Sequence, residues 1–423
     1  MQKQNLNGKK VCLINLGCKV NKYEIDCMAT ILNNNGYEIT YNHEPADYYI
    51  LGSCAVTNEA EKKSRQYITK LTKLNPNAKI IVVGCASEHN PEQFRKNNVI
   101  SVIGNEGREH VMELLNGNNF KPYELTKVYN NNVKCPYKAH TRAYVKIQDG
   151  CNNFCSYCII PFLRGRSRSR EFNEVIKEAT QLAKNSSEIV LTGIDCSSYK
   201  TLDGGLGDLI YALRNIPARI RLSSLEVTVI TKDFLEKLSK TKNFCPHFHL
   251  SLQCGSTSEL KRMNRHYTKQ DYLNRVNLIR SYFPNANITT DIIVGFPEET
   301  DSEFLDTIDV CEKAKFGHAH IFPYSLRNGT NAEKLVQVSP EVKKERVKLL
   351  TKKCKAIEQD FYKNMLGKTF TMLVEEQNNG MFEGYTENYI KVFVKSNNLV
   401  PNQLVKVKLT KVVSGGMIGE IAE

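Results

Sequence analysis

The chain has 423 residues, with 58 Lys and Arg against 45 Asp and Glu, 14 cysteines and no tryptophan. At ~100 to 200 residues per domain, this length accommodates roughly two to four domains. Nowhere does a run of about 18 uncharged apolar residues occur, which excludes a helical membrane-spanning protein. The first ten residues also lack the apolar stretch of a secretory signal, so we expect a cytoplasmic protein.

Cysteine content and net charge indicate what the thiols do and which class of partner the protein binds. In a reducing cytoplasm, thiols act as core residues, metal ligands or redox groups rather than as disulfides. The net charge of +13 and a pI near 9.0 favour a polyanionic partner, with nucleic acid as the first candidate.

The first part of the chain alternates apolar runs, each ending in small residues, with amphipathic stretches at helical spacing. This alternation is typical of βαβ units. It predicts an α/β domain with a parallel sheet over residues 1–125, followed by a polar linker at residues 126–140. The expected strands are Val11–Leu16, Tyr48–Leu51 and Ile80–Val83, and the expected helices are Tyr23–Asn33 and Glu59–Leu74.

A second alternating series predicts a central α/β domain over residues 141–366. Its strand and helix repeats are typical of either a barrel-like curved sheet or an open doubly wound sheet. The expected strands are Tyr144–Ile147, Glu188–Thr192, Arg219–Leu225, His247–Leu252, Ile288–Val294 and His318–Phe322. The expected helices are Glu171–Lys184, Gly207–Asn215, Thr231–Lys240, Thr268–Tyr282, Thr300–Lys315 and a basic exit helix, Pro340–Met365.

The last segment, residues 367–423, changes to the two-residue period of strands. Apolar and polar residues alternate over Phe370–Val374, Tyr389–Val394 and Leu404–Val413, with Gly and Asn turns between them. This pattern predicts a small antiparallel β-barrel of the OB type, a fold that often contacts RNA. Its six Lys equal its six Glu in number, so the excess positive charge belongs to the first two domains.

The strongest motif is Cys151-Asn-Asn-Phe-Cys155-Ser-Tyr-Cys158, which follows the first predicted strand of the central domain. We name Cys151, Cys155 and Cys158 the triplet cysteines. Three thiolates this close in sequence can hold one soft metal centre, and a 4Fe-4S cluster bound by three cysteines keeps one iron open to another ligand. The alternative is a zinc site completed by a remote ligand such as Cys135 or His140, although zinc sites favour two separated pairs.

Each of the three predicted N-terminal strands ends in a Gly, and a Cys follows that Gly either directly or after one further residue. We name Cys18, Cys54 and Cys85 the strand-end cysteines. If the strands are parallel, their carboxyl ends share one edge of the sheet and the thiols converge there, with the glycines admitting a bulky centre. The alternative is that each cysteine is a small apolar core residue. The repeated Gly-Cys placement favours a metal site.

An arginine run follows the triplet cysteines. Its members, at alternate positions with no acidic residue among them, are Arg164, Arg166, Arg168 and Arg170. Because Arg binds phosphate well, we expect these four side chains to contact nucleic acid, the alternative being a solvated charged surface.

The triplet motif, with Tyr157 before its last cysteine and a series of βα units after it, resembles the radical S-adenosylmethionine (SAM) superfamily. Taken together with the strand-end cysteines and the C-terminal barrel, the whole chain resembles a methylthiotransferase. That family has an N-terminal methylthiotransferase domain, a central partial (β/α)6 radical-SAM barrel and a small antiparallel, OB-like TRAM barrel. The resemblance is carried by Leu16-Gly-Cys-Lys-Val-Asn-Lys-Tyr-Glu24, Val145-Lys-Ile-Gln-Asp-Gly-Cys151, Thr290-Asp-Ile-Ile-Val-Gly-Phe-Pro-Glu-Glu299 and Phe322-Pro-Tyr-Ser-Leu-Arg-Asn-Gly-Thr330.

The resemblance implies two 4Fe-4S clusters and SAM as cofactors. The cluster on the triplet cysteines would bind and reduce SAM, giving a 5′-deoxyadenosyl radical that removes hydrogen from C2 of an adenine. The cluster on the strand-end cysteines would carry the sulfur to be inserted, and a further SAM would supply the methyl group. Strand position suggests SAM contacts from Tyr157, Thr192, Gly193, Glu226, Gln253 and Asp291.

Within the family, the Gly-Cys-Lys-Val-Asn form at 17–21 and the Phe-Pro-Tyr-Ser form at 322–325 resemble the bacterial branch acting on tRNA. That branch converts N-threonylcarbamoyladenosine beside the anticodon, at position 37, to its 2-methylthio derivative. The resemblance therefore implies the tRNA anticodon loop, a sulfur donor and an electron donor such as flavodoxin or ferredoxin as partners, with no membrane. The alternatives are methylthio transfer to isopentenyladenosine tRNA or to a ribosomal protein, and a non-enzymatic zinc-bound RNA-binding protein.

Overall fold

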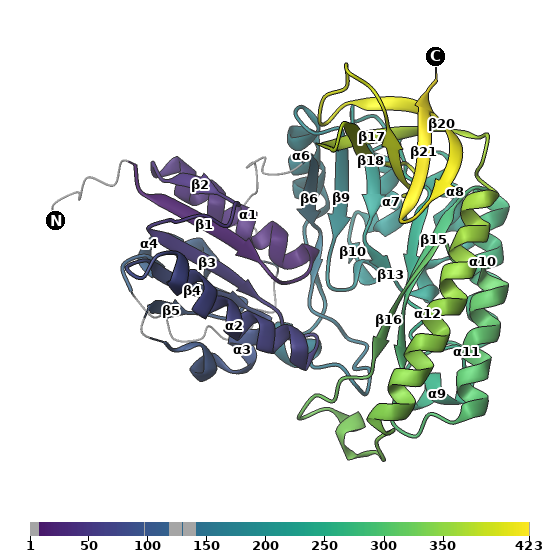
Figure 1. The fold of residues 1–423 in the computed structure, drawn as a ribbon, viewed down its shortest axis with the longest axis horizontal. Coiled ribbons are helices and arrows are strands. Elements are labelled where there is room, and N and C mark those ends of the chain that lie inside the picture. Colours follow the sequence, from purple (N-terminus) through teal and green to yellow (C-terminus); the bar gives the residue numbers. More distant parts are fainter. Residues whose placement is uncertain (1–7, 97, 118–128, 130–140, 423) are drawn as a thin grey trace.

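The computed structural model describes residues 8–96, 98–117, 129 and 141–422 (Figure 1). Three main sheet structures follow one another along the chain: an N-terminal parallel sheet, a central curved sheet and a C-terminal closed barrel. The strand pairs β7-β8 and β10-β11 form two small additional sheets. The predicted linker at 126–140 lies outside the described residues apart from Tyr129, and Cys135 and His140 lie there with it. In the described part of the chain, no helix is long and apolar enough to cross a membrane.

The N-terminal sheet is entirely parallel, as the alternation predicts, and apolar clusters pack on both of its faces. In sheet order its strands are β2 (Glu38–Thr40), β1 (Lys10–Asn15), β3 (Tyr48–Ser53), β4 (Lys79–Gly84) and β5 (Val99–Val102). The short outer strands β2 and β5 are missing from the prediction because they have few residues for a pattern. The helical segments are α1 (Lys19–Asn34), α2 (Asn58–Leu74), α3 (Cys85–His89), η1 (Pro91–Phe94), η2 (Arg108–His110) and α4 (Val111–Leu114).

The central domain is a curved parallel sheet whose strands follow chain order. One group pairs in the order β12-β9-β6, and the other pairs in the order β13-β14-β15-β16. A parallel bridge between Ile220 and Phe244 joins the two groups. Chain order without reversal is the topology of a barrel, so the doubly wound alternative is excluded. The strands are β6 (Arg142–Lys146), β9 (Glu188–Thr192), β12 (Arg219–Leu222), β13 (Ser224–Leu225), β14 (His247–Leu250), β15 (Asn287–Val294) and β16 (His318–Pro323).

Helices cover the outer face of this sheet (Figure 1). Alternate strand residues such as Phe248 and Leu250 enter the large apolar core beneath the helices, while their neighbours face the inside of the curve. The helices are α6 (Phe172–Ala183), α7 (Leu206–Ala212), α8 (Lys232–Ser239), α9 (Thr257–Arg262), α10 (Lys269–Tyr282), α11 (Asp301–Ala314) and α12 (Pro340–Lys363). Smaller elements near the cysteines are β7 (Gln148–Asp149), α5 (Ile160–Arg164) and β8 (Arg168–Ser169), and others are η3 (Cys196–Ser198), β10 (Lys200–Thr201), β11 (Gly204–Gly205), η4 (Val227–Val229) and η5 (Asn331–Lys334).

The C-terminal strands close into a five-stranded barrel. In barrel order they are β17 (Thr369–Asn378), β18 (Met381–Thr386), β19 (Lys391–Val394), β21 (Gly416–Ile421) and β20 (Leu404–Val413). The pattern predicted a purely antiparallel barrel, but β19 and β21 pair in parallel. A connection longer than a hairpin separates these two strands, and it is long enough to reverse the chain direction.

The C-terminal barrel covers the amino ends of the central strands, away from the triplet loop (Figure 1). Arg219 and Arg221, on β12, donate hydrogen bonds to the barrel carbonyl oxygens of Thr371, at 2.8 Å, and Glu387, at 3.0 Å. The same two guanidinium groups pair with Glu188, which is fully buried at the start of β9. One carboxylate thus holds the arginines that attach the barrel to the central domain.

Candidate active site

The strand-end cysteines follow the carboxyl ends of three neighbouring strands. β1, β3 and β4 are adjacent and parallel, and the register pairs Ser53 with Gly84 at the carboxyl ends of β3 and β4. Cys18 is exposed before α1, Cys54 is half-buried after β3, and Cys85 is buried at the start of α3. The parallel topology therefore brings the three thiols to one edge of the sheet.

The glycines beside these cysteines are required by packing within the protein. A Cβ atom on Gly52 would lie 2.4 Å from Ile25 Cδ1. One on Gly84, where φ is +113°, would lie 2.6 Å from the carbonyl oxygen of Ser53 and 2.9 Å from the side-chain nitrogen of Asn21. The expectation that the glycines admit a bulky centre is corrected at these two positions, because protein atoms occupy the space. The glycines instead let the strand ends approach one another.

Charged and polar groups surround the strand-end thiols. Burial, reinforced by the neighbouring thiols, raises the pKa of Cys54 to about 11. Burial also raises the pKa of Cys85, but Arg164 opposes this effect, since its Nε donates a hydrogen bond to Cys85 Sγ at 3.2 Å. Cys18 Sγ donates to Asn21 Oδ1 at 3.2 Å, while Asn21 Nδ2 is buried without a hydrogen-bond partner in the part of the chain that the structure describes. The site thus combines three soft ligands with a cation and an unused amide donor.

The triplet cysteines lie on the loop between β7 and α5, at the carboxyl end of β6, and all three are half-buried. Burial raises the pKa of Cys151 to about 11 and that of Cys158 to about 12. Arg265, itself buried, donates a hydrogen bond to Cys155 Sγ at 3.4 Å. Each set of cysteines therefore has one buried arginine against a sulfur atom.

Glu226, one of the expected SAM contacts, lines a pocket beside the triplet loop. The segments that follow β9, β13 and α9 form the pocket together with Asn153 of the triplet loop. The carboxylate of Glu226 forms an ion pair with Arg265. Burial, with Glu226 adding a smaller effect, raises the pKa of Asp195 in the same pocket to about 6. Two acidic side chains here share one cation.

Three further expected SAM contacts lie at the carboxyl ends of β6 and β9. Thr192 is buried as the last residue of β9, and Gly193 follows it at a place where a Cβ would lie 2.9 Å from Gln148 Oε1. Tyr157 is half-buried, with its ring edge-to-face against Phe296 at a centroid separation of 6.3 Å. These three residues lie in or beside the triplet loop, but other side chains already pack against two of them, Gln148 against Gly193 and Phe296 against Tyr157.

The last two expected SAM contacts, Gln253 and Asp291, do not line the pocket that contains Glu226. Gln253 has a φ of +65°, and its backbone pairs with β15 through the Asp291 carbonyl oxygen and the Ile293 amide. The Asp291 carboxylate faces the inside of the curved sheet and accepts a hydrogen bond from His249 Nε2 at 3.2 Å. Burial alone raises the pKa of Asp291, but His249 outweighs it and the net shift is downward.

The structure corrects the expectation for the arginine run. Arg164 is fully buried, Arg170 is 1% exposed and Arg168 is 8% exposed, so these three guanidinium groups have no surface to offer to a phosphate. Arg170 pairs with Glu178. Arg166 alone remains exposed, and its guanidinium lies over the ring of Phe154, 4.3 Å from the centroid.

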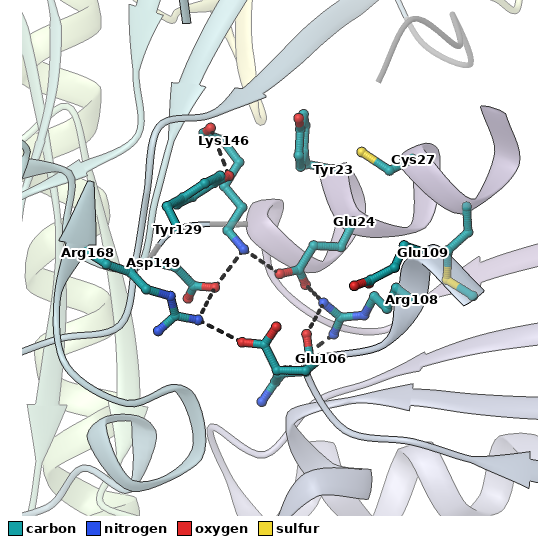
Figure 2. A pocket seen from close by; sticks show the side chains of 12 residues that line it. Tyr23, Glu24, Cys27, Glu106, Arg108, Glu109, Tyr129, Lys146, Asp149 and Arg168 are labelled. Atoms are coloured by element: carbon teal, nitrogen blue, oxygen red, sulfur yellow. Dashed lines mark hydrogen bonds and ion pairs between the residues drawn. The ribbon is translucent and has the colours of Figure 1, made fainter. Parts of the chain in front are cut away.

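The buried arginines belong to an ion network between the N-terminal and central domains. Figure 2 shows Lys146 reaching Glu24 and Asp149, at 2.7 and 2.6 Å, and Arg168 linking Asp149 to Glu106. Burial by itself raises the pKa of Glu24, but the surrounding cations outweigh it and lower the value to about 2. The network fixes the edge that bears the strand-end cysteines against the triplet loop.

Comparisons with known proteins identify the family. Residues 145–311 match the model of the Radical SAM superfamily, and residues 10–104 match that of the uncharacterized protein family UPF0004. The chain is 38% identical over 413 residues to the threonylcarbamoyladenosine tRNA methylthiotransferase MtaB of Thermotoga maritima, which covers 95% of this chain and 94% of that protein. This chain belongs to the radical SAM methylthiotransferase family.

A second relative has a different stated substrate. The methylthiotransferase is 35% identical over 440 residues to the tRNA-2-methylthio-N(6)-dimethylallyladenosine synthase of Bacillus cytotoxicus, with 98% of this chain and 86% of that protein covered. Among solved structures, the radical S-adenosylmethionine methyltransferase TsrM from Kitasatospora setae, with cobalamin and a 4Fe-4S cluster bound, matches with a TM-score of 0.51. That match has 14% sequence identity and covers 75% of each chain, so it supports the fold.

The cysteines of the methylthiotransferase fit the cofactors that the family implies, SAM and 4Fe-4S clusters. Within the described ranges, no three His, Cys, Asp or Glu side chains form a group that would hold a single metal ion. A four-iron cluster binds each thiolate to a different iron, so its ligands stand further apart than those of one zinc ion. Arg164 and Arg265 supply positive charge beside sulfur atoms that would be anionic as cluster ligands, and Asn21 Nδ2 is a donor without a partner among the described residues.

Several residues of the methylthiotransferase site escaped the sequence reasoning. Arg265 and Asp195 line the pocket with Glu226, and Asn21 and Glu24 lie beside the strand-end cysteines. The partners of these residues are distant in the chain: Arg265 is 110 residues from Cys155. No local spacing signals such a pair. Two sequence signals include Asn21 and Glu24: their place on the helix after the first Gly-Cys pair, and the Leu16–Glu24 motif that carries the resemblance.

Proposed function

We propose that this methylthiotransferase converts N-threonylcarbamoyladenosine at position 37 of tRNA to its 2-methylthio derivative, as the name of the Thermotoga maritima relative states for that protein. The observation that carries the proposal is the meeting of the two cysteine sets. Arg164 contacts Cys85 through Nε, and the next residue, Gly165, accepts a hydrogen bond from the amide of Cys151 at 3.1 Å. Inserting sulfur into a substrate activated at the triplet site requires the two sites to be neighbours.

We propose that the triplet cysteines hold the 4Fe-4S cluster that binds SAM and that the strand-end cysteines hold the second cluster. When bound, the first cluster supplies the electron that cleaves SAM. Glu226 and Asp195 offer carboxylates to the positively charged groups of SAM, and Arg265 balances them beside Cys155. Thr192, Gly193 and Tyr157 border the same loop, whereas Gln253 and Asp291 are better placed toward the inside of the barrel, beside His249.

We propose that tRNA contacts the methylthiotransferase beside the triplet loop, through Arg166, Phe154 and Phe162. The Phe162 side chain is 61% exposed, and its ring lies edge-to-face against Phe154 at 5.8 Å. Exposed aromatic rings beside an arginine are a common platform for unpaired RNA bases, with the guanidinium reaching a phosphate. The anticodon loop supplies unpaired bases, so these three residues are suited to bind it where the target adenosine would approach the triplet loop.

The remaining partners follow from the chemistry. An electron donor of the flavodoxin or ferredoxin type and a sulfur donor would serve the enzyme in the cytoplasm. The net charge of +13 favours encounter with tRNA and with acidic electron carriers. We further propose that the C-terminal barrel, residues 367–423, is a TRAM domain.

Mass spectrometry of tRNA nucleosides tests the function. Deleting the gene should remove the 2-methylthio derivative of N-threonylcarbamoyladenosine and leave the unmodified nucleoside in its place. The wild-type gene should restore the modification, whereas C151A should not, because one ligand of the SAM-binding cluster is lost. Loss of the methylthio group from dimethylallyladenosine instead would identify the other tRNA branch, and unchanged tRNA would refute both.

Binding assays test the proposed RNA contact. R166A should weaken tRNA binding and reduce the slope of log K against log salt by about 1, and F162A should cost ~1 to 3 kcal/mol of binding. The matched control is R214A, because Arg214 is also exposed and stacks on an exposed aromatic ring, that of Tyr211, at 4.1 Å, but lies on the outer helical face at α7. Equal effects of R166A and R214A would contradict the assignment.

A further inference from the structure

Arg164 joins the two cysteine sites through a single side chain and its own backbone. It is the last residue of α5, its side chain is fully buried, and its guanidinium contacts groups from both domains. Nη1 and Nη2 donate to the two carboxylate oxygens of Glu24 at 2.9 and 3.0 Å, and Nη1 also donates to Asp149 at 3.2 Å. Nε is left to donate to Cys85 Sγ at 3.2 Å.

The planar guanidinium determines where Nε points. Its donors lie in one rigid plane, so a bidentate pair with Glu24 also fixes the direction of the Nε–H bond. Glu24 comes from α1 and Asp149 from β7, so the orientation of the fork is set by both domains together. The Cys85 thiol is therefore held against a cation whose position depends on the domain interface.

The backbone of the same segment holds the triplet loop. The carbonyl oxygen of Gly165 accepts the amide of Cys151 at 3.1 Å, and a Cβ on Gly150 would lie 2.7 Å from that oxygen. Arg168 Nη1 donates to the carbonyl oxygen of Arg164 at 2.6 Å, which fixes the peptide that precedes Gly165. A movement of this segment would displace both cysteine sites at once.

We propose that Arg164 is the positioning residue of the second cluster. It would hold the Cys85 thiol at a fixed position relative to the triplet loop and set the reduction potential of that cluster. The inference rests on the proposed function only in that the strand-end cysteines bind a cluster. A reduced cluster carries one electron more than the oxidised cluster, and a cation beside its thiolate stabilises the added negative charge. Loss of the Arg164 charge should therefore make the potential more negative.

The test isolates the second cluster in the full-length chain. A background variant with C151A, C155A and C158A retains only the strand-end ligands, and its reconstituted cluster is followed by potentiometric titration and electron paramagnetic resonance. In this background, R164M should shift the midpoint potential to a more negative value and change the resonance spectrum. The matched control is R108M, because Arg108 is also buried and pairs with Glu24, but among the described residues its guanidinium donates no hydrogen bond to a sulfur atom and reaches Cys85 only through Asn105.

A second variant keeps the proposal falsifiable if R164M does not fold. R164K retains the charge but cannot donate to Glu24 and Cys85 in the fixed geometry of the fork. It should alter the resonance spectrum while shifting the potential less than R164M. Wild-type spectra and potentials in a folded R164M or R164K variant would overturn the proposal, and so would equal effects of R108M. These measurements need no tRNA, so an incorrect substrate would appear in the nucleoside assay alone.

Discussion

One buried carboxylate, that of Glu188, orders the arginines that bind the C-terminal barrel, and E188Q tests its contribution directly. Glu188 accepts hydrogen bonds from Arg221 Nε at 2.8 Å and Arg221 Nη2 at 3.0 Å, pairs with Arg219, and lies 3.3 Å from Arg142 Nε. Burial opposes its ionisation, but the arginines outweigh burial and hold the pKa of Glu188 well below its usual range. Glutamine has the same shape without the charge, so the guanidinium groups would remain buried with too few acceptors.

Removing one partner of a buried ion cluster costs ~3 to 5 kcal/mol, and because the glutamine oxygen still accepts a hydrogen bond we expect a loss of about 3 kcal/mol. A loss of that size accelerates amide exchange controlled by opening of this region by about 100-fold. Hydrogen exchange measured by mass spectrometry should show this change in peptides covering β9, β12, β17 and β18. The control is E236Q, because Glu236 is exposed and, within the described residues, its carboxylate forms an ion pair with Lys240 alone. Exchange within threefold of wild type in E188Q would refute the argument.

Three further predictions concern titration and backbone strain. Burial raises the pKa of Glu259 to about 8 from 4.5, so its contribution to stability falls as pH rises from 4.5 to 8. E259Q should therefore be more stable than wild type near pH 8, by on the order of 3 kcal/mol, and near equal at pH 4.5, as measured by thermal unfolding; a pH-independent difference would contradict this. Conversely, Glu24 has a folded pKa of about 2 against 4.5, so its stabilisation is present above pH 4.5 and is lost as pH falls toward 2. Limited proteolysis at the domain interface should increase over that range in wild type, and a similar increase in E24Q would argue against Glu24 as its cause. G84A should destabilise the N-terminal domain by at least ~2 kcal/mol, since the new Cβ would lie 2.6 Å from a carbonyl oxygen at a φ of +113°. G329A, at a φ of +82° with open space around it, should cost about 1 kcal/mol, and equal denaturant midpoints for the two variants would contradict the packing argument.

The triplet cysteines illustrate what a local pattern can establish. Their ligands lie within one loop, so spacing alone indicates a shared metal centre. The residues between them do have distant partners, such as Arg262 for Ser156, but those contacts were not needed to name the ligands. The strand-end cysteines need one further assumption, that β1, β3 and β4 are parallel neighbours, and alternation of strands and helices supports it. Both sets of candidate ligands could therefore be named before any tertiary contact was known.

The SAM contacts could be predicted less well. Position at a strand end identified Glu226, which lines the pocket, but it also selected Gln253, whose backbone is part of the sheet. Strand ends in a curved sheet point both into the barrel and toward its rim, and the period of a strand does not distinguish these directions. Arg265 was missed as a pocket residue because its partners, Glu226 and Cys155, come from other repeats of the barrel.

The sequence by itself determined the fold class, the order of the three sheet structures and the six candidate cluster ligands, because each depends on periodicity or on short-range spacing. Only the tertiary structure decided which side chains of the arginine run are exposed and which are buried. Four arginines at alternate positions look alike in sequence, yet Arg166 is exposed while Arg164, Arg168 and Arg170 are buried. Whether an arginine is buried depends on carboxylates from other elements, such as Glu24 on α1 and Glu178 on α6. A charged side chain is stable in the interior only where a group of opposite charge pairs with it.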